Sequence, residues 1–225
     1  MMRVAIHQPN YLPWPGYFYK MFKCDIFIFL DDAQYTKNSF INRNRIKTPS
    51  GEQWLTVPVH GSLSERINEV KTKDDIWKAK HIKTLQLNYC KAPYFSQYFE
   101  DIASIINEPE NLISEINMKL IKHIARVLEV PCKFMISSEI GSDKTADDRL
   151  IDLIHKVGGD FYLSGKGGAN YQSEEKFKAN DIELHYYDFK PPQYPQLWKE
   201  FIPALSIIDM LFNCGPESRR IMGIE

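Results

Sequence analysis

The sequence predicts an α/β fold in which a mostly parallel sheet is flanked by helices, and three observations support this prediction. Residues 3–6 form a short apolar run of branched character, which indicates a first strand. Residues 26–30 are fully apolar, as expected of a strand buried on both faces of a parallel sheet. Residues 17–22 between them are long enough for a short helix, so the chain opens in strand–helix–strand order.

The rest of the chain continues this pattern around a helical middle. Residues 112–128 carry apolar side chains at helical spacing, among them Ile113, Ile116 and Leu120. Because no linker-like segment interrupts the chain, we expect a single α/β domain over 1–225, with 77–128 as a helical insertion or subdomain. Further strands are expected over 54–59, 133–136, 161–163 and 182–187, and further helices over 77–89, 95–106, 147–157 and 206–213, with Ser173 capping another.

Composition excludes several classes of partner. The 28 basic and 29 acidic residues give a net charge of -1, which argues against a nucleic-acid or membrane-surface protein. Charged residues interrupt the apolar runs near the N-terminus, so we expect a cytoplasmic protein without membrane insertion. The 4 cysteines form no CxxC pair and are expected to be free thiols. Without a carboxylate or cysteine cluster at ligand spacing, no metal is predicted.

The segment after the first strand is the most distinctive part of the sequence. Residues 7–17 read His-Gln-Pro-Asn-Tyr-Leu-Pro-Trp-Pro-Gly-Tyr, and the prolines exclude a helix or a central strand. A rigid loop at the carboxyl end of a strand is where open α/β sheets place ligands. His7 is the acid–base candidate, since histidine titrates near neutral pH; the alternative is a histidine that only hydrogen-bonds the loop. Gln8 and Asn10 are expected to orient a substrate or cap loop amides, and Tyr11, Trp14 and Tyr17 to stack on a ring or to pack.

The second strand ends in Asp31 and Asp32. Adjacent strand residues face opposite ways, so at most one of them faces a site, and Asp32 is taken as the catalytic candidate. The alternative is a turn or capping pair. The segment that follows, residues 37–47, is rich in basic and amide side chains, which suit a phosphate or carboxylate ligand or form a solvated loop. The substrate-binding candidates here are Gln34, Lys37, Arg43, Asn44 and Lys47.

A glycine-rich segment follows the strand expected at 161–163. Backbone amides in such a turn can form a nest for an anion, although glycines also occur in strand-to-helix turns for steric reasons. The segment lacks the Gly-Lys-Ser/Thr ending of a P-loop, and the chain lacks the Gly-x-Ser-x-Gly of a serine hydrolase. Arg149 precedes it and is expected to line the same edge. The binding candidates are Ser164, Gly165, Lys166, Gly167 and Gly168.

Together these motifs resemble the WbqC-like family over nearly the whole chain. The pieces that carry the resemblance are residues 7–14 with 16–18 and Lys20, 29–32 with Gln34, 42–44 with 46–47, 54–59, 92–95, 162–165 with 167–168 and Tyr171, and 205–209 with 211–213. The resemblance implies a role in bacterial O-antigen or surface-polysaccharide biosynthesis, with transfer of glycine to a sugar as one suggested activity. It carries over no catalytic residue.

A second resemblance concerns the fold. The opening strand, histidine-containing turn, helix and acid-ended second strand resemble the Rossmann-like nucleotidyltransferases of the HIGH-motif superfamily. Those enzymes hold ATP phosphates with turn histidines and a helix N-terminus. Trp14, Gly16 and Tyr17 stand where a second histidine is expected, which departs from that pattern.

The leading functional hypothesis is a transferase that moves an aminoacyl (for example glycyl) or acyl group to a nucleotide-linked amino sugar. His7 accepts the proton of the attacking amine, amides near residues 165–168 hold an anion, and Lys37, Arg43 and Lys47 bind the diphosphate. The sequence does not identify the cofactor, for which an activated acyl donor and ATP are the two candidates. The alternatives are a nucleotidyl- or adenylyl-transferase and a sugar-nucleotide binding protein without catalysis.

Overall fold

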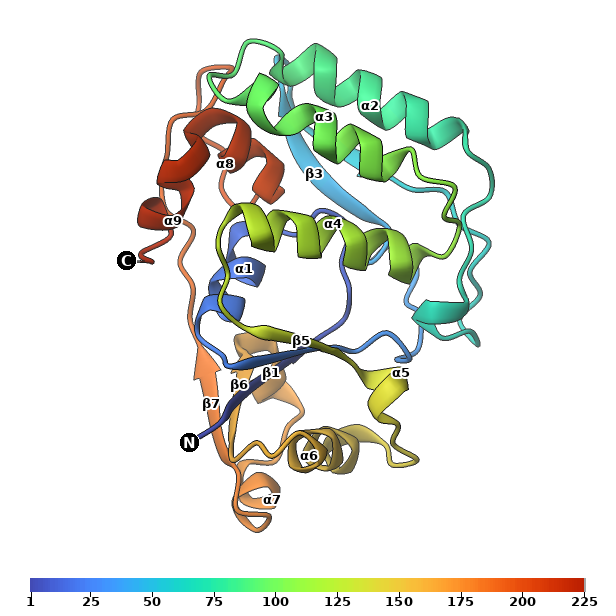
Figure 1. Cartoon of the computed structure of the whole chain (residues 1–225), viewed down its shortest axis with the longest axis vertical. Coiled ribbons are helices and arrows are strands. Elements are labelled where there is room, and N and C mark those ends of the chain that lie inside the picture. The colour runs from blue at the N-terminus through green and yellow to red at the C-terminus, as the bar shows by residue number, and fades with distance from the viewer. Residues whose placement is uncertain (225) are drawn as a thin grey trace.

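The computed structural model describes residues 1–224 and contains a five-stranded sheet in the order β5-β2-β1-β6-β7 (Figure 1). Every neighbouring pair in this sheet is parallel. The α/β class predicted from the sequence is therefore confirmed. The strands are β1 (Arg3–His7), β2 (Ile26–Phe29), β5 (Lys133–Ile136), β6 (Phe161–Gly165) and β7 (Glu183–Tyr187).

Helices cover both faces of the sheet (Figure 1). One side carries α1 and α4, with α2, α3 and α8 beyond them, and the other side carries α6 and α7. The bounds are α1 (Pro15–Phe22), α2 (Ile76–Tyr89), α3 (Phe95–Ile106), α4 (Ile113–Val127), α6 (Ala146–Lys156), α7 (Glu174–Lys178) and α8 (Ile207–Cys214), with the short α5 (Ser137–Ile140) and α9 (Ser218–Ile221). Three 3-10 turns are η1 (Ile67–Glu69), η2 (Lys166–Asn170) and η3 (Gly215–Glu217).

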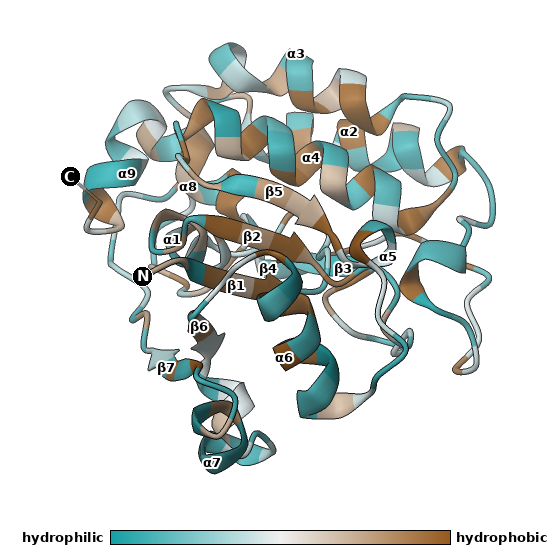
Figure 2. Ribbon diagram, turned by 60° about the horizontal axis from the view of Figure 1, so that its bottom comes forward, coloured by the Kyte–Doolittle hydropathy of each residue, from teal (hydrophilic) through white to brown (hydrophobic). Residues whose placement is uncertain are grey.

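The two faces of the sheet build two separate hydrophobic cores. Successive strand residues point to opposite faces, so Phe27 and Phe29 of β2 enter the larger core while Ile26 and Ile28 enter the smaller one. Figure 2 shows the hydrophobic character of β1 and β2, which lie between the helical layers. Burial on both faces explains why these strands are continuous apolar runs in the sequence.

The helical middle packs into the larger core. Leu85 of α2, Ile102 of α3 and Ile124 of α4 belong to the same buried cluster as Phe27 and Phe29. The description of residues 77–128 as an insertion or subdomain of a single domain over 1–225 stays a prediction. No helix among residues 1–224 is long and apolar enough to cross a membrane.

A hairpin replaces the basic loop expected at residues 37–47. The second half of that segment is β3 (Arg43–Thr48), paired antiparallel with β4 (Gly51–Thr56), so the prediction of a loop is wrong there and the strand expected at 54–59 begins earlier. The charged residues are compatible with a strand because Arg45 pairs with Glu52 at 2.7 Å across the hairpin. The Arg43 guanidinium lies 4.3 Å from the centre of the Trp54 ring.

Candidate functional site

The order of the strands creates a crevice between β1 and β6. From β1 the sheet continues through β2 to β5 in one direction, whereas β6 and β7 extend it in the other. The pairing of β1 with β6 ends at Val4 opposite Tyr162, although β1 continues to His7 and β6 to Gly165. Open α/β sheets bind ligands in the crevice outside the carboxyl ends of the strands where the strand order reverses.

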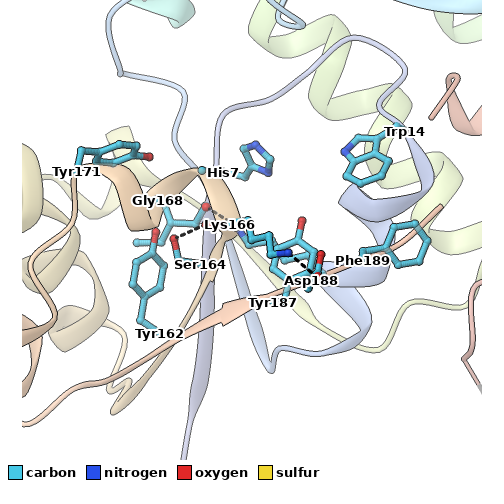
Figure 3. A pocket seen from close by; sticks show the side chains of 14 residues that line it. His7, Trp14, Tyr162, Ser164, Lys166, Gly168, Tyr171, Tyr187, Asp188 and Phe189 are labelled. Carbon is cyan, nitrogen blue, oxygen red and sulfur yellow. Dashed lines mark hydrogen bonds and ion pairs between the residues drawn. The ribbon is translucent and has the colours of Figure 1, made fainter. Parts of the chain in front are cut away.

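A cavity of about 500 Å³, here called the first cavity, opens at this crevice. Figure 3 shows Trp14 and Phe189 together at one end and Tyr171 at the opposite end, with His7 between them. Aromatic ends around a polar middle suit a ligand that has both a ring and a charged group. The remaining lining residues are Ile6, Lys20, Tyr162, Ser164, Gly165, Lys166, Gly167, Gly168, Tyr187 and Asp188.

A second cavity of about 690 Å³ adjoins the first. The two share Ile6, His7, Tyr162 and Tyr171 in their walls, so they meet at the carboxyl end of β1. The second cavity extends to the start of α6, and Tyr171 between the two is 76% exposed. Its other lining residues are Gln8, Leu30, Ala33, Gln34, Lys144, Thr145, Ala146, Asp147, Arg149, Leu150 and Gln172.

His7 is held as a neutral imidazole between the two cavities. Its ring stacks on Tyr17 at a centroid distance of 4.7 Å, and the Tyr17 hydroxyl donates to the Gln8 carbonyl at 2.9 Å. Burial, with the nearby Lys20 charge as a second cause, lowers the pKa of His7 well below its usual range. The buried Nδ1 has no hydrogen-bond partner among the described residues. The neutral ring lines both cavities and can accept a proton from a ligand there.

Lys20 is a functional candidate that sequence reasoning did not include in the site. It is 2% exposed, and its Nζ donates to the Ile6 carbonyl at 2.8 Å. Burial lowers the pKa of Lys20 to about 8, and no carboxylate within residues 1–224 pairs with it. A buried ammonium without a counter-ion is unfavourable, and this one lines the first cavity, where a ligand anion can compensate it. The sequence feature that could have identified it is a single lysine among the aromatic residues of a short amphipathic helix.

The glycine turn, defined here as residues 164–168, forms the opposite wall of the first cavity. It comprises the last two residues of β6 and the first three of η2. Lys166 Nζ pairs with Asp188 at 2.6 Å (Figure 3). Ser164 Oγ lies 2.9 Å from Gln172 Oε1. The structure thus brings all five candidates of this segment to the same cavity as His7 and Trp14.

Gly168 has no room for a side chain, which gives a first prediction. A Cβ there would overlap Gln172 Oε1 and lie 2.5 Å from Ser164 Oγ, so Gly168→Ala must break the contact between these side chains. Overpacking of this kind costs about 1–3 kcal/mol. We expect a lower melting temperature and weaker binding of a nucleoside diphosphate, measured by calorimetric titration with UDP. Gly167→Ala is the matched control because its Cβ would meet nothing within 4 Å; equal behaviour of the two variants contradicts the prediction.

Buried amide and hydroxyl side chains fix the loop that follows β1. The Leu12 carbonyl accepts hydrogen bonds from Asn44 Nδ2 and Ser206 Oγ, both at 2.7 Å. Asn117 Nδ2 donates to the Pro9 carbonyl at 2.9 Å and to the Ile41 carbonyl at 2.7 Å. Of the predicted binding residues, Asn44 therefore lies in the core and holds this loop in place.

Removing the Asn117 amide tests this anchoring. Asn117→Ala leaves two buried carbonyls without their donor, and each unsatisfied group costs about 1–3 kcal/mol. We expect the free energy of unfolding in urea to fall by about 3 kcal/mol in total. Asn111→Ala, at an exposed position just before the same helix, is the control and should change stability by less than about 0.5 kcal/mol. Similar losses in both variants would contradict the anchoring role.

Three aromatic or polar candidates of the loop take different positions. Tyr11 is fully buried, and its hydroxyl lies 2.9 Å from His81 Nδ1, so it packs in the core away from both cavities. Tyr17 is also fully buried and supports His7. Asn10 is half-buried and lines neither the first nor the second cavity.

Asp32 lies behind the second cavity. Its carboxylate pairs with the Arg149 guanidinium and accepts a hydrogen bond from Ser137 Oγ. Arg149, Gln8 and Gln34 line the second cavity, whereas Asp32 lines neither cavity. Asp32 is thus placed to orient Arg149 and does not itself face the ligand space.

The basic candidates are not brought to the glycine turn. Lys47 is buried, and its Nζ donates to Gln196 Oε1 at 3.1 Å and to the Glu200 carbonyl. Arg43 is stacked on Trp54, and Lys37 lines a separate hollow beside Pro58. The expectation that these residues share a site with His7 is therefore corrected: the hairpin carries β3 away from the carboxyl ends of the parallel strands.

These features define a class of protein: an α/β protein with a ligand crevice at the reversal of strand order in a parallel sheet. A model of the WbqC-like protein family matches residues 8–221, and the chain belongs to this family. It is also 37% identical over 224 residues to the uncharacterized protein Rv1507c of Mycobacterium tuberculosis (strain ATCC 25618 / H37Rv), across 97% of this chain and 96% of the relative. No solved structure matches the chain, and the resemblance to HIGH-motif enzymes is not confirmed.

Proposed function

We propose that the protein transfers an aminoacyl or acyl group to the amine of a nucleotide-linked amino sugar at the crevice between β1 and β6. The observation that carries this proposal is the buried ammonium of Lys20, which pairs with no carboxylate of residues 1–224 and lines the first cavity beside neutral His7. Membership in the WbqC-like family suggests a role related to polysaccharide biosynthesis and supports a carbohydrate substrate.

The first cavity is suited to the nucleotide part of such a substrate. Lys20 provides a buried positive charge for the diphosphate, and the glycine turn, whose backbone amides can serve as anion donors, lines the same space. Trp14 and Phe189, whose ring centroids are 5.4 Å apart, offer an aromatic surface for a base or a sugar ring. This arrangement supports binding of the diphosphate by Lys20 and the glycine turn in place of Lys37, Arg43 and Lys47.

His7 supplies the proton acceptor for the transfer. The amine nitrogen of the acceptor attacks the acyl carbon of an activated donor, such as a thioester or an acyl phosphate. The new N–C bond forms as the bond from that carbon to its leaving group breaks. The proton released by the nitrogen passes to the neutral imidazole of His7, which lines both cavities. The imidazolium then returns the proton to the leaving group or to water.

A turnover assay tests the proposal. The purified protein is incubated with a UDP-linked amino sugar and with acyl-coenzyme A donors or with ATP and amino acids, and the sugar nucleotide is followed by mass spectrometry. We expect its mass to increase by the acyl group, with no change for the analogous UDP-linked sugar that carries a hydroxyl in place of the amine. Tight binding without a mass change under any donor would contradict transfer and indicate a sugar-nucleotide binding protein.

A further inference from the structure

The charges that line the second cavity are paired within the protein, with one exception. Arg149 pairs with Asp32, and Lys144 lies 3.5 Å from Asp152. Asp147 is 9% exposed and accepts a hydrogen bond from the Ser173 backbone N–H at 2.9 Å, but no basic side chain of the described residues pairs with it. Asp147 therefore leaves the second cavity with a largely buried carboxylate that has no basic side-chain partner within residues 1–224.

The position of Asp147 in the first turn of α6 does not by itself explain this burial. Asp148 is its neighbour in the same turn, where the helix dipole favours acidic residues. Asp148 is exposed and pairs with Lys176 at 2.7 Å, as expected of a residue that serves only the helix end. Asp147 instead faces a cavity of about 690 Å³.

We propose that the second cavity is a subsite for a primary ammonium group, which binds beside Asp147 while an anion occupies the first cavity beside Lys20. The two cavities carry buried charges of opposite sign, neither of which has an oppositely charged side-chain partner in residues 1–224, and they share the wall formed by His7 and Tyr171. A ligand that carries a phosphate and an amine can therefore satisfy both charges at once, with His7 between them.

This inference rests on the proposed function and names the group that gives it specificity. The amine of the acceptor binds as an ammonium beside Asp147, and loss of one proton to water gives the nucleophile that attacks the donor. A hydroxyl analogue leaves the Asp147 carboxylate without a cation, which penalises its binding. Asp147 is thus a specificity-determining residue, and the subsite distinguishes amino sugars from ordinary sugars.

The test uses two small isosteric probes and nuclear magnetic resonance, which detects weak binding. Ethanolamine carries an ammonium group at pH 7, and ethylene glycol replaces it with a hydroxyl. We expect ethanolamine to shift the amide signals of residues 145–149 saturably, both without and with inorganic pyrophosphate, and ethylene glycol to leave them unchanged. Pyrophosphate should shift the signals of the glycine turn.

Asp147→Asn removes the charge but keeps an oxygen that can accept from the Ser173 N–H. In this variant we expect ethanolamine affinity to fall at least about tenfold, because a tenfold change equals about 1.4 kcal/mol and a charge-assisted hydrogen bond contributes more than that. The pyrophosphate response should be retained. Asp148→Asn is the matched control and should keep both responses.

The outcomes separate the inference from the proposed function. Equal responses to the two probes, or an unchanged ethanolamine response in Asp147→Asn, overturn the ammonium subsite even where pyrophosphate still binds at the glycine turn. Displacement of ethanolamine by pyrophosphate overturns simultaneous occupation. Absence of a pyrophosphate response at the glycine turn instead contradicts the anion site on which the proposed function depends.

Discussion

His7→Ala lowers the rate of transfer by about a thousandfold, the range in which a positioned general base contributes. His7 lies on the wall shared by the two cavities, and burial keeps its imidazole neutral there. Its buried Nδ1 has no hydrogen-bond partner in residues 1–224. Its removal takes away the proton acceptor but leaves Lys20 and the glycine turn intact. Binding of UDP, measured by calorimetry, should therefore change by less than about threefold, within the 0.5 kcal/mol typical of a neutral substitution.

The pH dependence adds a second readout for His7. Since burial holds the pKa of His7 well below 6.5, its imidazole stays neutral at pH values where an exposed histidine is already protonated. The transfer rate should stay constant from neutral pH through pH 6.5 and fall only at lower pH. His60→Ala, which alters an exposed histidine, is the control and should retain full activity. A fully active His7→Ala protein would exclude His7 as the base.

Lys20→Met weakens anion binding strongly and at the same time stabilises the fold. The methionine side chain fills a similar space without a charge, so the first cavity loses its buried cation. We expect UDP affinity to fall by about a hundredfold, the upper range for loss of a charge-assisted contact. Lys23→Met, near the end of the same helix, is the control and should bind UDP normally. Normal UDP binding by Lys20→Met would contradict the assignment of the anion site.

The stability effect follows from proton linkage. The pKa of Lys20 is about 8 in the folded protein against 10.5 for an ordinary lysine, so between these values the unfolded chain binds a proton that the folded chain has lost. The free energy of unfolding therefore rises with pH across this window, and at pH 7 the folded protein bears the full cost, about 3 kcal/mol. Lys20→Met removes both the cost and the pH dependence, although the lost bond to the Ile6 carbonyl offsets part of the gain. Urea denaturation at pH 7 and at pH 10 measures both effects.

Local patterns predicted most of the helices and the parallel strands. The helix expected at 95–106 and the strand expected at 133–136 have the predicted bounds, because their apolar spacing and flanking residues are strong signals. β3 was missed because its side chains are mostly charged or polar, and the Trp54 ring and Glu52 that accommodate them lie on the partner strand. Tertiary contacts of this kind override local propensity.

The site was only partly predictable for a similar reason. His7, Trp14 and the glycine turn could be nominated because each follows a predicted strand. The structure places β6 next to β1, and this pairing brings residues 164–168 close to His7. The order of the strands in the sheet cannot be read from the sequence, so this proximity could not be predicted. Lys20 was not nominated as a site residue from the sequence. Only the packing of α1 against the sheet shows that its charge is buried and pairs with no carboxylate of the described residues.

The most direct test of the central claim is a crystal structure of the protein with UDP bound. The account predicts the diphosphate in the first cavity, within hydrogen-bond distance of Lys20 Nζ and the backbone amides of the glycine turn, with the uracil ring near Trp14 and Phe189. Binding of the diphosphate instead to Lys37, Arg43 or another surface away from the carboxyl ends of β1 and β6 would contradict it.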